Sequence, residues 1–268
     1  MTEEQQQSLC ALIRKLGAQA QALRNAGLQV DKKARQDFVS HADLFVEKEI
    51  KNWLSSHCPQ DGFLGEESGL QAGEQGTWVL DPIDGTTNYI QGMDYWCISL
   101  AYVRQNEIDL GIIYAPDRDE FFFARRGKGA FLNDKRLTLR EPDPETVIIG
   151  IGRSSRAPVE NYTRTIARVI NAGMEYRRFG AGALMLAHVA TGQVHAYYEE
   201  HMNSWDALAG MLIIVEAGGV SNAFLADDGL LNGNLVLAGC VDVQARLSAL
   251  LVRSEERRVG KECRSRWS

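Results

Sequence analysis

The chain has 268 residues, of which 45% are hydrophobic and 24% are charged, so it can bury a core in one large domain or in two lobes. Its formal net charge of −6 disfavours a general nucleic-acid binder, because phosphate backbones are captured by clustered Lys and Arg. No apolar run approaches the roughly 18 residues of a membrane span, the N-terminus is polar and acidic, and the five cysteines include no CxxC pair, which together predict a cytoplasmic protein with reduced thiols.

The first half of the chain predicts helices and then strands. Apolar residues recur at helical spacing from Leu9 to Leu23 and again over residues 42–53, where Ser40 precedes the stretch as a natural N-cap. From residue 77 onward, apolar runs separated by turn residues predict an antiparallel meander over 78–81, 96–103, 108–115 and 120–127. A hairpin should follow, turning at Asn133 and Asp134.

The second half predicts an alternation of strands and helices. EPDPE, residues 141–145, is the best linker candidate, so we expect one lobe over 1–142 and a second over 143–252. Strands are expected near 146–152, 177–179, 194–199 and 235–239, and helices near 159–172, 183–192, 205–219 and 241–252. The pattern indicates a mixed α/β protein in which helices cover sheets. Residues 253–268 change abruptly to a basic composition, and we interpret them as a non-native or disordered tail, with a nucleic-acid-binding tail as the alternative.

Two aspartates stand three positions apart in WVLDPIDGTTNY, residues 78–89. A single aspartate at a strand end is usually a turn residue or a helix cap. Asp81 and Asp84 held close together would repel by about 4 kcal/mol at ~4 Å and an effective dielectric near 20, and Mg²⁺, which takes oxygen ligands, would remove that cost. The N–H groups of Gly85 and Thr86, at the start of a helix, are placed to receive a phosphate. The stretch therefore predicts a joint site for metal and phosphate.

Three other stretches supply further acids. Glu66 and Glu67 follow an apolar pair in FLGEES, where a solvated turn is the alternative. Asp206 lies in the first turn of an apolar helix, where it would also complement the helix dipole. Asp43 follows Ser40 by three residues, and a capping box would explain it.

WVLDPIDGTTNY, FLGEES and WDALAGMLIIVEAGG resemble, in order and separation, the signature motifs of the inositol monophosphatase family. The similarity spans about residues 32–252. It implies a layered αβαβα sandwich of two lobes, the N-terminal one with an antiparallel sheet and the C-terminal one with a mixed sheet. It also implies a Mg²⁺-dependent, lithium-sensitive phosphatase that forms a homodimer and needs neither membrane nor nucleic acid.

The resemblance also implies roles for particular residues. The metal ligands would be Glu66, Asp81, the main-chain carbonyl of Ile83, Asp84 and Asp206. Thr86 would hydrogen-bond the attacking water, Asp43 would orient Thr86 and help to accept the proton, and Glu66 would join them in catalysis. Substrate contacts would fall to Asp84, Gly85, Thr86, Gly180, Gly182 and Glu199, with Glu200 as a competing choice for the last. Glu67 and Lys32 would support the ligands from behind.

The activity that this resemblance implies is hydrolysis of myo-inositol monophosphate to inositol and phosphate by metal-activated water. Related sugar or alcohol phosphatases, acting on histidinol phosphate or fructose 1,6-bisphosphate, are alternatives, as is a non-catalytic protein or RNA interaction module on the same fold. Ala181, Gly182 and Asn203 depart from the commoner residues of the family and leave recognition of the substrate ring open. The five histidines form no HxxxH or HExxH pair, so a zinc mechanism has no visible ligands.

Overall fold

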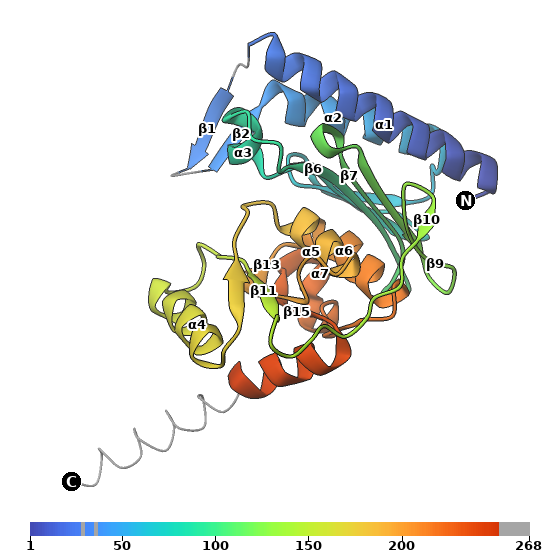
Figure 1. Ribbon diagram of the computed structural model, residues 1–268. Coiled ribbons are helices and arrows are strands. Elements are labelled where there is room, and N and C mark those ends of the chain that lie inside the picture. Colours follow the sequence, from blue (N-terminus) through green and yellow to red (C-terminus); the bar gives the residue numbers. More distant parts are fainter. Residues whose placement is uncertain (28–29, 35–36, 252–268) are drawn as a thin grey trace, which may run out of the picture.

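The computed structural model describes residues 1–27, 30–34 and 37–251, and for 30–34 and 37–39 it describes the backbone alone. Five layers are stacked in the order helices, sheet, helices, sheet, helices (Figure 1). This arrangement confirms the predicted αβαβα sandwich. The predicted tail, 253–268, lies outside the described residues.

The first layer consists of α1 (Glu3–Asn25) and α2 (His41–His57), as predicted from the two apolar stripes. A capping box begins each helix, with Thr2 as N-cap of α1 and Ser40 as N-cap of α2, so backbone N–H groups at the helix start are satisfied. The apolar faces of both helices pack against the first sheet, where Leu9, Ile13 and Ile50 are fully buried. A small hairpin of β1 (Val30–Ala34) and β2 (Asp37–Ser40) leads into α2.

The first sheet contains β3 (Gly62–Gly65), β4 (Gly69–Gln71), β5 (Thr77–Asp84), β6 (Cys97–Arg104), β7 (Glu107–Ala115), β8 (Glu120–Arg125), β9 (Gly129–Leu132) and β10 (Lys135–Arg136). Their order is β10, β9, β8, β7, β6, β5, β3, β4. The predicted meander is confirmed in β5 to β8, and Asn133 and Asp134 form the predicted turn with φ of 44° and 64°. One pair departs from the expected antiparallel arrangement, because β3 runs parallel to β5.

The second sheet is mixed, as expected, and contains β11 (Ile148–Ile151), β12 (Glu175–Arg177), β13 (Ala196–Met202), β14 (Val220–Ser221) and β15 (Asn234–Gly239). The order is β12, β11, β13, β15, β14, and β11 runs parallel to both β12 and β13. The strand expected at 177–179 ends two residues earlier than predicted. On the outer face lie α4 (Val159–Asn171) and a helix over 241–251 (Figure 1).

The middle layer consists of α5 (Gly182–Ala190) and α6 (Ser204–Glu216), which lie between the two sheets (Figure 1). Residues 183–190 of α5 are all buried, since both sides of the helix contact protein. Gly111 of β7 faces the backbone of Ala209, and Gly210 faces Leu186, so small residues permit close approach on both sides of α6. One hydrophobic core therefore joins elements on both sides of residue 142, and the division into lobes at that point stays a prediction.

The remaining elements are short: α3 (Thr86–Ile90), α7 (Gly229–Asn232) and two 3₁₀ turns, Pro116–Arg118 and Ala226–Asp228. Within the described residues, no helix is both long and apolar enough to cross a membrane.

Candidate active site

Three aspartates from distant parts of the chain meet between the two sheets. Asp81 and Asp84 come from the end of β5, and Asp206 comes from the first turn of α6. One carboxylate oxygen from each lies within 4.8 Å of the other two. Asp81 and Asp84 are 2% and 6% exposed, whereas Asp206 is partly exposed. The arrangement suits a hard cation with oxygen ligands.

An irregularity in β5 brings the first two aspartates together. Residues three apart on a regular strand point to opposite faces of a sheet. Asp81 pairs with Ser99 and Asp84 with Cys97, so three steps along β5 match only two along β6, and the extra residue turns both carboxylates the same way. The Ser99 hydroxyl donates to the carbonyl of Trp205 at 2.9 Å, which fixes the start of α6 beside them.

The Asp84 carboxylate also caps the N-terminus of α5. Its Oδ1 accepts a hydrogen bond from the N–H of Gly182 at 3.1 Å, and its Oδ2 accepts from Ala183 at 2.8 Å and Leu184 at 3.3 Å. These amides are among those that a helix leaves unsatisfied at its start. No local sequence pattern predicts this contact, since the two segments are about 100 residues apart. Gly182 was expected to approach the substrate ring, and that role stays a prediction.

The cluster is electrostatically strained without a cation. Burial raises the pKa of Asp84 to about 6, and burial together with the charges of Asp84 and Glu199 raises the pKa of Asp206 to about 7. Burial, followed by the charges of Glu66, Asp206 and Asp84, raises the pKa of Asp81 well above its usual value. The amides of α5 act in the opposite direction on Asp84. Among the described residues this is the only group of three or more His, Cys, Asp or Glu side chains with such geometry.

Gly85 sits between the aspartates and α3 in a left-handed conformation, with φ of 85°. A Cβ there would lie 2.9 Å from the Cβ of Ala181 and 3.1 Å from the carbonyl oxygen of Tyr95. Both the backbone conformation and the space therefore require glycine. The predicted phosphate contacts of Gly85 and Thr86 stay predictions.

Thr86 and Asp43 are the two residues predicted to act on the attacking water. The Thr86 hydroxyl donates to the main-chain carbonyl of Ile83 at 3.0 Å. Asp43 is fully buried, and its Oδ2 accepts from the N–H of Ser40 at 2.8 Å and from its hydroxyl at 2.6 Å. Asp43 Oδ1 is the one buried side-chain oxygen or nitrogen of the described residues with no hydrogen-bond partner. The capping box therefore explains half of this carboxylate and leaves the other half available.

Glu66 and Glu67 lie in the turn between β3 and β4. The N–H of Glu66 donates to the carbonyl of Leu80 at 3.1 Å, and the charge of Glu66 contributes to the raised pKa of Asp81, so Glu66 acts electrostatically on the cluster. Glu47 of α2, which the sequence analysis missed, is 4% exposed and accepts from the N–H of Glu67 at 3.0 Å. An acidic residue on the buried face of a helix is the signal that could have revealed it.

A cavity of about 270 Å³ opens beside the aspartates, and both Asp84 and Asp206 line it. Glu199 lines it too; it is 9% exposed, accepts from the Tyr197 hydroxyl at 2.6 Å, and has a pKa raised by burial to about 7. Glu200 is absent from the lining and accepts instead from Asn161 of α4 at 2.6 Å. The placement favours Glu199 over its neighbour as the substrate contact.

The other predicted residues are placed as follows. Gly180, with φ of 86°, and Gly182 line the same cavity, as does Asn203, whose Nδ2 lies 3.4 Å from Asp206 Oδ2. The side chain of Lys32 lies outside the described part of the chain.

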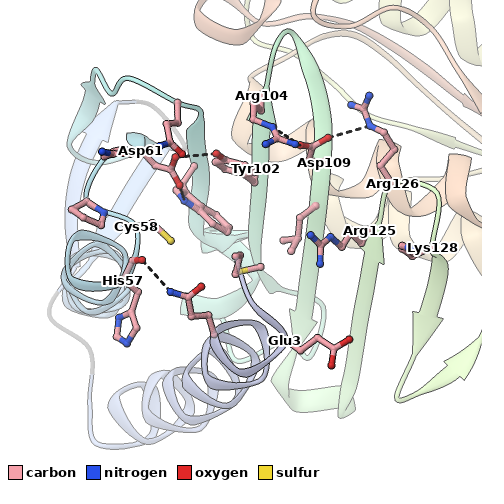
Figure 2. Close-up of a pocket in the computed structure, with 17 residues that line it drawn as sticks. Glu3, His57, Cys58, Asp61, Tyr102, Arg104, Asp109, Arg125, Arg126 and Lys128 are labelled. Carbon is pink, nitrogen blue, oxygen red and sulfur yellow. Dashed lines mark hydrogen bonds and ion pairs between the residues drawn. The ribbon is translucent and has the colours of Figure 1, made fainter.

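A larger cavity of about 760 Å³, shown in Figure 2, lies among the start of α1, the segment after α2 and the strands β5 to β8. Asp61 lines one side of it and Arg125 the other. None of the predicted site residues with a described side chain lines it. Its size alone does not make it the active site, because the acid cluster opens into the smaller cavity.

Comparison with known proteins agrees with this geometry. The model of the inositol monophosphatase family matches residues 1–256. An inositol-1-monophosphatase of Mesorhizobium japonicum is 40% identical over 229 residues, which cover 83% of this chain and 86% of the relative. A Nus factor SuhB of Xylella fastidiosa is 35% identical over 236 residues, covering 85% of this chain and 86% of the relative. The crystal structure of the Bartonella henselae suppressor protein SuhB has a TM-score of 0.83 at 35% identity, over 90% of this chain and 95% of that one.

Proposed function

The chain belongs to the inositol monophosphatase family, and from that premise we propose that it is a Mg²⁺-dependent inositol-1-monophosphatase. The observation that carries the proposal is the cluster of Asp81, Asp84 and Asp206, which opens into a cavity that also holds Glu199. The reaction is hydrolysis of myo-inositol monophosphate to inositol and phosphate. The family is metal-dependent, and the cluster can hold a metal ion; Mg²⁺ is the part that we propose.

Five oxygen-bearing groups would hold the metal: Glu66, Asp81, the carbonyl of Ile83, Asp84 and Asp206. Bound there, Mg²⁺ would supply charge neutralisation and Lewis acidity to the attacking water and the leaving oxygen. Asp84 Oδ1 accepts one hydrogen bond and keeps a lone pair for such a role. The raised pKa values of the aspartates support the fit, since a cation would replace the protons that otherwise relieve their repulsion.

The proposed roles of the other residues follow from their positions. The Thr86 hydroxyl, which donates to the Ile83 carbonyl, would rotate to orient the water. The unpartnered Asp43 Oδ1 would accept a hydrogen bond from Thr86 and then the proton of the water. Glu199 would accept from a ring hydroxyl, the backbone at Gly85, Gly180 and Gly182 would let phosphate and ring approach, and Glu67 and Lys32 would support the ligands. A homodimer, sensitivity to lithium and a cytoplasmic location complete the proposal.

The test is phosphate release from myo-inositol 1-phosphate, histidinol phosphate and fructose 1,6-bisphosphate, with Mg²⁺ and with EDTA. We expect phosphate release from the inositol ester in the presence of Mg²⁺ and none in EDTA. The variant Asp81→Asn should lose this activity, although its side chain keeps an acceptor for the N–H of Ile83. Failure to hydrolyse the inositol ester with Mg²⁺, while histidinol phosphate is turned over, would reject the substrate. Turnover that persists in EDTA would reject the metal.

The name of the Xylella fastidiosa relative, a Nus factor, favours one second candidate, a non-catalytic interaction module. The retained cluster speaks against it, because a module without a metal has no use for buried acids that repel one another when ionised. If the wild-type protein releases no phosphate from any ester, and Asp81→Asn binds a partner as wild type does, the module is the better account.

A further inference from the structure

Three arginines follow the carboxyl ends of two strands of the second sheet. Arg178 follows the end of β12 directly, and Arg153 follows the end of β11 by two residues, with Arg156 three positions further on. Gly150 of β11 pairs with Arg177 of β12 in a parallel register, so the two strands end level with one another. Ligands of open α/β sheets bind outside the carboxyl ends of such strands.

These arginines line the cavity of about 270 Å³ that Asp84 and Asp206 also line. The cavity thus has an acidic wall, where the scissile phosphate and the metal would lie, and an arginine wall made of Arg153, Arg156 and Arg178. Its volume is close to the lower end of the range for small-molecule sites, enough for a polyol of sugar size.

The arginine wall has no carboxylate partner among the described residues. Arg156 Nη1 lies 3.0 Å from His201 Nε2 and donates to the carbonyl of Asn232 at 3.3 Å, and neither of these groups is a carboxylate. Arg153 and Arg178 make no ion pair within the described chain, although elsewhere arginines such as Arg24 and Arg118 pair with aspartates. The charge of Arg178 reaches the cavity interior, since it lowers the pKa of Glu199 against the effect of burial. Three such cations on one wall are best satisfied by an anion.

We propose that the arginine wall binds a second anionic group on the alcohol portion of the substrate, so that a further phosphate or a carboxylate on the ring strengthens the binding of a phosphate monoester. The inference rests on the proposed function and deepens it, because a neutral polyol leaves all three cations unused. The reaction itself is unchanged: water attacks phosphorus, and the ester oxygen leaves with a proton.

The test uses three ligands that differ only at C6 of one sugar: glucose 1-phosphate, glucuronic acid 1-phosphate and glucose 1,6-bisphosphate. Each is measured as a competitive inhibitor of myo-inositol 1-phosphate hydrolysis at saturating Mg²⁺, so that its own turnover is not required. We expect the two ligands with a C6 anion to bind about tenfold more tightly than glucose 1-phosphate, as one charge-assisted contact would provide. Whether carboxylate or phosphate binds more tightly identifies the natural group.

The variants Arg153→Gln and Arg178→Gln, alone and together, should abolish the preference for a C6 anion and leave inhibition by glucose 1-phosphate within about twofold. Arg164→Gln is the matched control, because Arg164 is an exposed arginine of α4 whose side chain contacts Asn161. Equal inhibition by all three ligands, or a preference that survives in the double variant, overturns the inference while the proposed function stands. If the wild type does not hydrolyse the inositol ester, the proposed function fails, and calorimetric binding of the three ligands to the Mg²⁺-loaded protein decides on the arginine wall separately.

Discussion

Replacing Asp81 with asparagine should make the metal-free protein more stable and its activity lower. One carboxylate oxygen of Asp81 lies within 4.8 Å of one from Asp84 and one from Asp206. At that distance and an effective dielectric near 20, each ionised pair repels by about 3.5 kcal/mol. Asparagine removes that repulsion and keeps an oxygen that can accept the 2.9 Å hydrogen bond from the N–H of Ile83. After the loss of hydrogen bonding within the cluster, we expect a net gain of about 1 to 3 kcal/mol.

Mg²⁺ should reverse the order. A metal that binds the folded state alone stabilises it by about 2.7 kcal/mol when present at 100 times its dissociation constant. The wild type should show this gain, whereas the variant, which lacks one charged ligand, should show little of it. Urea unfolding of both proteins in EDTA and in Mg²⁺, above the pKa of about 7 of Asp206, measures the four free energies of unfolding.

Asp61→Asn is the control for the loss of a carboxylate elsewhere. Asp61 accepts from Trp78 Nε1 and from the Tyr102 hydroxyl, both at 2.9 Å, and it lies beside the larger cavity (Figure 2). Its replacement should lower stability equally in EDTA and in Mg²⁺. If Asp81→Asn is less stable than wild type in EDTA, or gains as much from Mg²⁺, the carboxylates do not repel one another and do not share a cation.

Three further outcomes are expected. Gly85→Ala should lower the free energy of unfolding by about 1 to 2 kcal/mol and remove most of the activity, because alanine is strained at φ of 85° and its Cβ meets Ala181. Thermal melts and phosphate release measure both effects, and no change in either would mean that the turn relaxes freely. Glu199→Gln should lower kcat/KM for the inositol ester about tenfold and Glu200→Gln less than twofold, and the reverse order would move the substrate contact to the other face of β13. In EDTA, the Tm should fall as the pH rises from about 5 to about 8, because the pKa is raised from 3.8 to about 6 in Asp84 and to about 7 in Asp206, and such acids favour the folded state only while they are protonated. Mg²⁺ should flatten this profile, and a Tm that rises over the same pH range would contradict the burial of these carboxylates in one cluster.

Much of the architecture could be predicted from local patterns. The apolar stripe and the cap at Ser40 predicted α2, because both signals lie within one helix. The short strand β3 was missed, since four residues are too few to show a period and its neighbour β5 is supplied from further along the chain. The shift of β12 by two residues reflects the same lack of local signal in a strand of three residues.

The site, too, could be predicted from the sequence only in part. The sequence motifs indicated Asp81, Asp84 and Asp206, but the irregularity that turns the first two to one side depends on pairing with β6. The contact of Asp84 with α5 and the support from Glu47 both join segments that no local pattern connects. The arginine wall was equally hidden, because its members follow different strands that meet only in the folded sheet.

The hydrogen bonds between Asp84 and the first turn of α5 couple the position of this helix to ion binding. The same carboxylate belongs to the acid cluster and holds the start of α5, so binding of an ion and positioning of α5 would form one coupled equilibrium. Ion binding at one end should slow hydrogen exchange of the amides of Ala183 and Leu184 at the other. A distant substitution that tilts α5, such as one at Gly210 where it faces Leu186, should weaken ion affinity without touching a ligand.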